Sequence, residues 1–179
     1  MRAPLVLLLI VTASGSLARA AHAQTADDVH LPPITVGTAA SFDLARKGAS
    51  DVPGGAGAIL TFDGNVNRCV AVVTELAGSP RMRSIMVGGR VSTPYFREGA
   101  APRIPGRFFA ETLAGRNSGG LAPPGAVVQV GVGADLLVVP RGLALRWALD
   151  YLFSPSARHD FNGARFSIGI VVGPRLRHG

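Results

Sequence analysis

The chain has 179 residues, a length typical of one domain. Its formal net charge is +7, but the basic residues are spread along the sequence without interleaved aromatic residues, so we expect no nucleic-acid partner. Glycine (23) and proline (13) are plentiful, while aromatic residues make up only 6%. This composition favours short strands joined by many turns over a helical bundle.

Residues 1–23 have the layout of a cleavable secretory signal peptide. Arg2 supplies a basic start, and residues 5–13 form an apolar run that is too short to span a membrane as a helix. The small-residue motif Ala-His-Ala then predicts cleavage between Ala23 and Gln24, and hence export. Without the leader the chain has 16 basic and 11 acidic residues, a charge suited to an anionic membrane surface.

Residues 24–33 are polar and end in two prolines, which predicts a disordered lead-in before a single domain at residues 34–179. Eight segments of this domain alternate apolar and polar residues, the period of a strand with two different faces. The predicted strands are residues 36–44, 56–63, 69–76, 83–91, 107–114, 128–138, 143–153 and 164–172. No run after the leader reaches 18 apolar residues, so no transmembrane helix is expected.

The two faces of these segments differ in chemistry. We interpret the apolar face as free of Asp, Glu, Lys and Arg. This absence is expected of a face in lipid, because a Lys or Arg facing the middle of a bilayer costs about 2–4 kcal/mol. We expect it to contact lipid through Val130, Val132, Leu136, Leu145, Trp147, Leu149, Tyr151, Phe166, Ile168 and Ile170. Buried charges persist when they are paired, so we expect a polar network inside a barrel from Asp63, Glu75, Arg90, Glu111, Gln129, Asp135, Arg146, Asp150 and Arg165.

The connections between the predicted strands also differ in length. Two are short, at residues 64–67 and 140–142, and three are longer, at residues 46–55, 115–125 and 154–163. Short turns on one side and longer loops on the other are typical of outer-membrane barrels. The segments 92–106 and 77–80 break that alternation of lengths. Within the first of these, Tyr95 and Phe96 are expected either at a membrane interface or over a barrel mouth.

No motif predicts a catalytic, cofactor or metal site. His159 and Asp160 adjoin in a loop, but no serine placed to form a triad with them is recognised on a strand. Gly131 and Gly133 precede no helix, so they are interpreted as inward glycines that make room for charged neighbours. Cys69 is the only cysteine, cannot form an intramolecular disulfide and is interpreted as a small apolar filler.

Four motifs follow one another in an informative order. They are DGNVNR (63–68) with VVTEL (72–76) just after it, then VGGRVS (87–92), FFAETLAGR (108–116), and the long closing segment from residue 130 to residue 172. Together they resemble the outer-membrane β-barrel domain family, the eight-stranded OmpA-like transmembrane barrels of Gram-negative-type bacteria, over residues 36–172. Such barrels usually end on an aromatic-bearing strand, and this chain departs from that pattern after Ile170.

The resemblance implies an all-β fold: an eight-stranded antiparallel up-and-down transmembrane β-barrel in the outer membrane, with a polar interior and no wide pore. It implies contacts with outer-membrane lipids, lipopolysaccharide and the barrel assembly machinery, and it brings no catalytic residue or cofactor. Our preferred hypothesis is an integral membrane protein with a structural or surface-interaction role. A lipid-modifying barrel enzyme of the lipid A deacylase type, or a soluble secreted barrel that binds an apolar ligand, stays open, because alternation alone does not say which face is wet.

Overall fold

The computed structural model describes residues 29–47, 55–79, 82–97, 104–118, 124–139, 142–153, 162–173 and 175–176. The predicted signal peptide, most of the longer loops and the His159–Asp160 pair lie outside these residues and stay predictions. No helix long and apolar enough to cross a membrane occurs in the described part of the chain.

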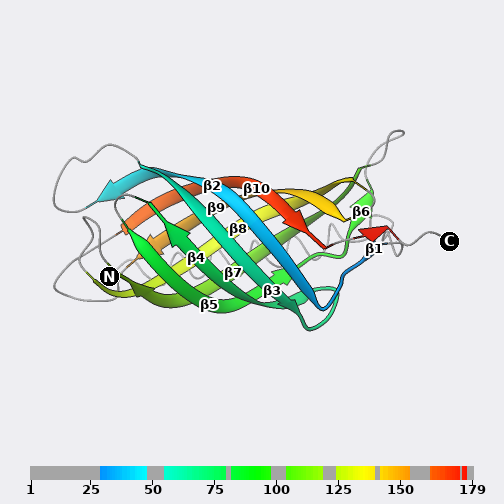
Figure 1. Cartoon of the computed structure of the whole chain (residues 1–179), viewed down its shortest axis with the longest axis horizontal. Helices are drawn as coiled ribbons and strands as arrows, with labels where there is room; N and C mark the ends of the chain where they lie inside the picture. The colour runs from blue at the N-terminus through cyan, green and yellow to red at the C-terminus, as the bar shows by residue number, and fades with distance from the viewer. Residues whose placement is uncertain are drawn as a thin grey trace.

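Eight antiparallel strands close into a barrel (Figure 1). They are β2 (Ile34–Lys47), β3 (Ala56–Asn65), β4 (Val70–Gly78), β5 (Arg83–Ser92), β7 (Pro105–Asn117), β8 (Gly125–Val139), β9 (Leu143–Phe153) and β10 (Asn162–Val172). Each pairs with its neighbour in the chain, and β10 pairs with β2 to complete the circle. The predicted eight-stranded, antiparallel up-and-down barrel is therefore confirmed.

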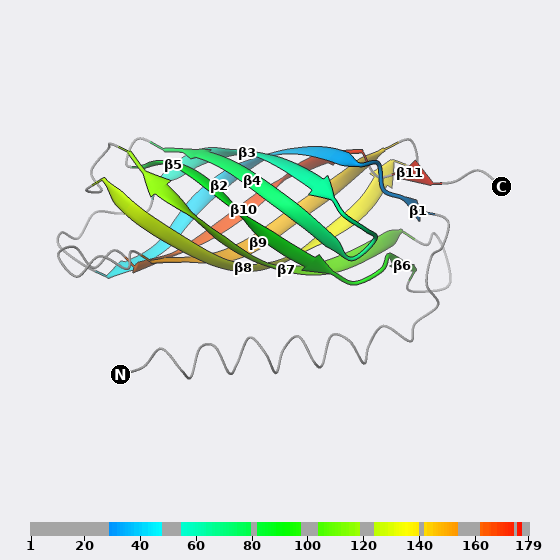
Figure 2. The ribbon, with the colours of Figure 1, turned by 90° about the horizontal axis from the view of Figure 1, so that it is seen from below.

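Three two-residue strands lie at one end of the barrel (Figure 2). β6 (Phe96–Arg97) pairs with the start of β7, and β1 (Val29–His30) pairs with β11 (Arg175–Leu176). The ordered domain was expected to begin at residue 34, whereas the described structure begins at Val29. The earlier start has a physical reason: the Asn65 side chain donates to the Pro32 carbonyl, and the Asn65 backbone amide donates to the Pro33 carbonyl, both at 2.8 Å.

The two ends of the barrel differ. We call the end that carries β1 and β11 the terminus end; it also holds the β3–β4 turn and the β5–β7 connection with β6. We call the opposite end the loop end, because the longer connections expected from the sequence start and finish there. The up-and-down order also puts the brief β4–β5 connection at the loop end, which explains why it broke the expected alternation of lengths.

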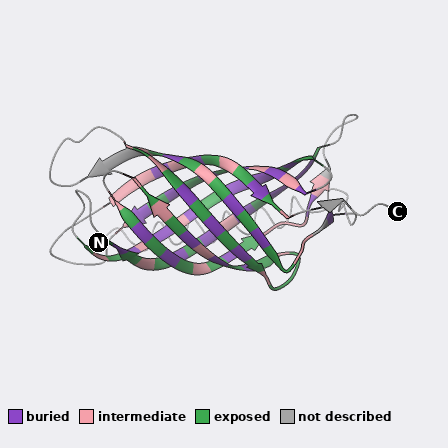
Figure 3. Cartoon of the chain, in the orientation of Figure 1, coloured by how far each residue is buried: buried purple, intermediate pink, exposed green. Residues whose placement is uncertain are grey.

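Burial alternates along every barrel strand (Figure 3). On β9, for example, Ala144, Arg146 and Ala148 are buried while Trp147 and Leu149 are exposed. Successive side chains point to opposite faces of a sheet, so a closed sheet directs one set inward and the other outward.

Two outward positions, Gly106 and Ala134, are buried and depart from the alternation. Ala134 is only 3% exposed, although its parity is that of the apolar outer face. Its partners on the neighbouring strands are Phe108 and Trp147, so a small side chain stands between two large aromatic ones.

The predicted strand bounds agree with the structure most closely on β9, which runs from Leu143 to Phe153 as expected. Other strands are longer than predicted; β7, for example, was expected to end at Ala114 but extends to Asn117. Both neighbours hold the extension in place, since Asn117 pairs with Ser84 of β5 and with Gly125 of β8.

Two consecutive glycines on β5 allow a test of this packing. A Cβ atom on Gly88 would overlap the backbone of Thr112 and Leu113 on β7, whereas a Cβ atom on Gly89 meets nothing within 4 Å. We expect Gly88→Ala to lower the free energy of unfolding by about 1–3 kcal/mol through overpacking. The matched variant Gly89→Ala should be neutral or stabilising by about 0.5 kcal/mol. Urea unfolding of both variants in detergent micelles measures this, and equal effects would contradict the β5–β7 register.

Candidate functional site

The barrel interior holds a buried polar network. All nine residues proposed for it from the sequence lie on the inward face, and none is more than 7% exposed. They come from seven strands: β3, β4, β5, β7, β8, β9 and β10. The structure adds Arg107, which is 3% exposed. Arg107 has the same strand parity as Glu111, so the alternation could have identified it.

Six of these residues form what we call the balanced cluster: Asp63, Arg90, Arg107, Glu111, Asp135 and Arg146. Arg107 and Arg146 hold the two oxygens of Asp135, with Arg107 Nε 2.9 Å from Oδ2 and Arg146 Nε 2.7 Å from Oδ1. Arg90 donates Nε and Nη2 to Glu111 Oε2 at 2.8 and 2.6 Å. Arg90 and Arg146 both pair with Asp63, the latter at 3.1 Å. Three guanidinium groups therefore meet three carboxylates.

The remaining residues form the Arg165 cluster: Glu75, Gln129, Asp150 and Arg165. Arg165 Nη2 donates to Glu75 Oε1, Asp150 Oδ2 and Gln129 Oε1 at 2.8, 2.9 and 2.8 Å. Gln129 Nε2 in turn donates to Glu111 Oε1 at 3.1 Å, which joins the two clusters. In this cluster one guanidinium group serves two carboxylates.

An aromatic ring and two glycines shape the space around these charges. The Phe109 ring packs against two guanidinium groups, with Arg90 Cζ 4.6 Å and Arg146 Cζ 5.2 Å from its centroid. A Cβ atom on Gly133 would overlap that ring, and one on Gly131 would overlap the Asp150 carboxylate. These glycines thus occupy positions where a side chain would displace Phe109 or Asp150.

Apolar clusters lie beyond the charges toward both ends. The inward residues of β8 run from Val127 through Gln129 and Asp135 to Leu137, that is, from apolar to polar and back to apolar. Val127 belongs to a cluster on the loop-end side: Val73, Met86, Leu113, Val127 and Leu152. Leu137 belongs to one at the terminus end: Val29, Tyr95, Leu137, Ala144 and Val171. Both ends of the ion-paired region are therefore covered by hydrocarbon.

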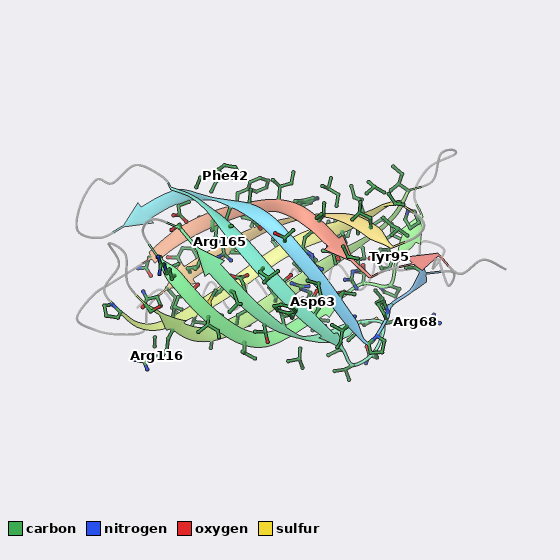
Figure 4. All side chains as sticks on the ribbon, viewed as in Figure 1. Phe42, Asp63, Arg68, Tyr95, Arg116 and Arg165 are labelled. Carbon is green, nitrogen blue, oxygen red and sulfur yellow. The ribbon has the colours of Figure 1, made fainter. Side chains whose placement is uncertain are left out.

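Tyr95 contributes to the cover at the terminus end, where Figure 4 shows it. Its side chain is 4% exposed, and the Arg107 guanidinium lies 5.1 Å from its ring centroid. Burial raises the pKa of Tyr95 to about 12, so the phenol is neutral at physiological pH. Of the two positions expected for Tyr95, the structure has the one over the barrel mouth.

The outer face of the barrel is apolar and accessible. Phe42, Val132, Trp147, Leu149 and Ile168 are each 38–45% exposed, and Figure 4 shows Phe42 on the outside of the wall. The other outward residues named from the sequence are exposed or half-buried: Val130, Leu136, Leu145, Tyr151, Phe166 and Ile170.

The expectation of an outer face without charge needs a correction at its rim. Arg83 opens β5 and Arg116 lies near the end of β7, and both are exposed with outward parity. The strand predicted at residues 107–114 ended before Arg116. Arg83 begins the strand predicted at residues 83–91, but its position on the apolar face was not recognised. Both arginines lie at the loop end, away from the middle of the apolar band.

The described residues provide no group of three His, Cys, Asp or Glu side chains arranged to hold a metal ion. Cys69 is half-buried next to the β3–β4 turn. There the Asn67 side chain accepts hydrogen bonds from the Cys69 and Val70 backbone amides at 2.7 and 2.8 Å, so this asparagine shapes the turn.

No family model and no curated protein matches the chain. Among solved structures, the chain is similar to Neisserial surface protein A, with 12% identity, a TM-score of 0.54, and coverage of 80% of this chain and 99% of that one. Lower TM-scores relate it to Ail, the attachment invasion locus protein of Yersinia pestis (0.38; 16% identity; 78% and 95% covered). The chain is also similar, with a TM-score of 0.37 and 9% identity, to the N-terminal β-barrel domain of Pseudomonas aeruginosa OprF, with 76% of this chain and 96% of that one covered.

The strand order and the likeness to Neisserial surface protein A define the class of the fold. It is a closed eight-stranded antiparallel up-and-down barrel, with paired charges inside and hydrocarbon outside. At this level of identity the likeness concerns the fold alone.

The balanced cluster can be tested at Arg146. The variant Arg146→Met removes a guanidinium group that pairs with both Asp63 and Asp135, and we expect a loss of about 3–5 kcal/mol in the free energy of unfolding. Arg116→Met removes an exposed guanidinium group and should change it by less than about 0.5 kcal/mol. Urea unfolding in micelles compares the two, and similar small losses would show that the interior pairs are not formed.

Proposed function

We propose that the chain is an integral outer-membrane protein with a structural or surface-interaction role, and that it is neither an enzyme nor an open channel. The observation that carries this proposal is the distribution of polarity across the barrel wall: paired charges are buried inside, and large apolar side chains are exposed outside.

The outer face supports a location in lipid. Large apolar side chains such as Val132, Leu149 and Ile168 are exposed around the wall, whereas soluble monomers rarely expose contiguous apolar patches larger than a few hundred Å². A soluble barrel that binds an apolar ligand would have the reverse arrangement, with these side chains in its core. In lipid the same side chains contact acyl chains, and the closed ladder leaves no strand edge unpaired.

The interior supports a closed barrel. An eight-stranded barrel is narrow enough for side chains to fill it. A cavity among the described interior residues has a volume of about 20 Å³, enough for a single water molecule, and the apolar clusters lie on both sides of the charges. Ions would have to cross hydrocarbon and displace paired guanidinium groups, so we propose no conductance.

The same pairing argues against catalysis within the wall. The buried carboxylates of the described residues already accept hydrogen bonds from guanidinium groups, as Asp135 does from Arg107 and Arg146. A general acid or base needs a proton-transfer path to substrate, and these groups are enclosed. We therefore place the activity of the protein at its surfaces, with the barrel as their anchor and the barrel assembly machinery as its route into the membrane.

The exposed arginines at the loop end suggest one binding partner for the surface of the barrel. Arg116 pairs with Ile85, and the Ser118 amide donates to the Arg83 carbonyl at 2.7 Å, so Arg83 and Arg116 are diagonal neighbours on the outward face. Figure 4 shows Arg116 extending from the wall at this end. Guanidinium groups bind phosphate oxygens with two parallel hydrogen bonds. We propose that this pair contacts the phosphates of lipopolysaccharide, with the loop end facing outward.

The location and the closed interior are tested together. The protein should fractionate with the outer membrane, and the purified protein should fold in detergent with a heat-dependent change in gel mobility. Reconstituted into planar bilayers, it should give no steady single-channel current, because the interior is filled. Recovery as a detergent-free monomer would contradict the membrane proposal, and stable channels from the folded form would contradict the closed interior.

The proposed phosphate contact is tested with Arg83→Gln/Arg116→Gln. In detergent micelles, each lost guanidinium–phosphate contact should lower the affinity for lipopolysaccharide about tenfold. The control is Arg68→Gln, at the opposite end of the barrel in Figure 4, which should leave affinity unchanged. Binding of dephosphorylated lipopolysaccharide should be weak for all forms. Undiminished binding by the double variant would rule out this pair as the contact.

A further inference from the structure

Among the described residues the buried charges do not cancel, and the excess is local. The balanced cluster has as many guanidinium groups as carboxylates, so its arginines are already engaged. In the Arg165 cluster, Glu75 and Asp150 share Arg165 as their cation, since both accept from its Nη2 atom. If both carboxylates are ionised, this part of the interior carries one uncompensated negative charge. An unpaired charge in a medium of low polarity is strongly unfavourable.

The surroundings of Asp150 show where the missing positive charge would be needed. Its side chain is only 2% exposed, and its Oδ2 atom accepts from Arg165 Nε and Nη2 at 3.2 and 2.9 Å. Its other oxygen, Oδ1, is buried and has no hydrogen-bond partner. Buried polar atoms in folded proteins nearly always have a partner, so this oxygen calls for one.

A cavity adjoins this carboxylate. It has a volume of about 20 Å³ and is lined by Asp150 and Glu75 together with the hydroxyl-bearing residues Thr61 and Ser167. A volume of about 10–15 Å³ is enough for one water-sized occupant. The cavity therefore offers oxygen ligands, a net negative environment and room for a single small species.

We propose that Asp150 and Glu75 form a buried site for one small monovalent cation, which is a proton or a sodium ion. In the first case one carboxylate takes up a proton from solvent and becomes a neutral acid, with no other bond made or broken. In the second case the carboxylate and hydroxyl oxygens coordinate the ion. Either occupant removes the excess charge of the Arg165 cluster.

The surrounding strands are consistent with a cationic occupant. Around the cavity, β7 contributes Glu111, β5 contributes Arg90 and β9 contributes Arg146, while the cavity residues of β2 are uncharged. Arg90 and Arg146 pair with the carboxylates of the balanced cluster, so neither is available to neutralise Asp150. Asp63 on β3 is held by the same two arginines, and Gln129 on β8 is neutral. This inference concerns the interior and does not rest on the proposed surface role.

The experiment measures the thermal unfolding midpoint of the full mature protein in detergent micelles. If the folded protein holds a proton that the unfolded chain releases at neutral pH, the midpoint falls as the pH rises from about 6 to about 9. If it holds sodium, the midpoint rises when sodium chloride replaces choline chloride at equal ionic strength. Infrared spectra separate the two: the proton gives a carboxylic acid carbonyl band that Asp150→Asn removes, and sodium gives none.

Two variants and one control make the test specific. Asp150→Asn and Glu75→Gln each remove the excess charge with little change of shape, so either should abolish the pH or sodium dependence and keep the midpoint at or above that of the wild type at high pH. The control, Gly88→Ala, overpacks the contact between β5 and β7 without changing a charge, so it should lower the midpoint while the dependence persists.

Three results would overturn the proposal. The first is a wild-type midpoint that responds to neither pH nor sodium, which would leave only water in the cavity. The second is a loss of stability in Asp150→Asn and Glu75→Gln as large as that in Gly88→Ala. The third is failure of both variants to fold, because removing an uncompensated charge should not prevent folding.

Discussion

The structure depends on the mutual neutralisation of charges within a narrow closed wall. Each buried guanidinium or carboxylate group loses its water, and this loss is offset only by pairing with an opposite charge in good geometry. The pairs connect strands that are distant in the chain: Arg146 of β9 reaches Asp63 of β3, and Arg165 of β10 reaches Glu75 of β4. The network therefore links the sheet across its interior as well as along its ladders.

This interior also determines what the outside must be. Because the side chains alternate, a strand that directs Arg146 and Asp150 inward directs Trp147 and Leu149 outward. A wall with charges on its inner face can be stable only if the outer face has an apolar solvent or another apolar surface against it. Lipid supplies such a solvent and, unlike water, does not compete for the hydrogen bonds of the ladder.

The two ends of the barrel differ in the residues that they present. At the terminus end, β1, β11 and Tyr95 cover the mouth, and a buried apolar cluster lies beneath them. At the loop end the outer face acquires its exposed arginines, Arg83 and Arg116, next to the connections that lead between strands. The proposed surface role is compatible with a closed wall whose interior is filled by paired charges and apolar clusters.

The sequence by itself determined the strands and their two faces, because a period of two in polarity is a local property that each segment carries alone. The barrel class followed only when the charged inner face and the connection lengths were added to this period. β9 shows this most clearly, since its bounds and both of its faces follow from eleven consecutive residues. Parity also held the information that Arg107 points inward, although the sequence reasoning did not use it. Only the tertiary structure decided which charges meet. Register and closure of the barrel bring together residues that no local pattern relates. They determine that Glu75 and Asp150 share Arg165, that Gly131 makes room for a neighbouring carboxylate, and that Tyr95 lies over the barrel mouth.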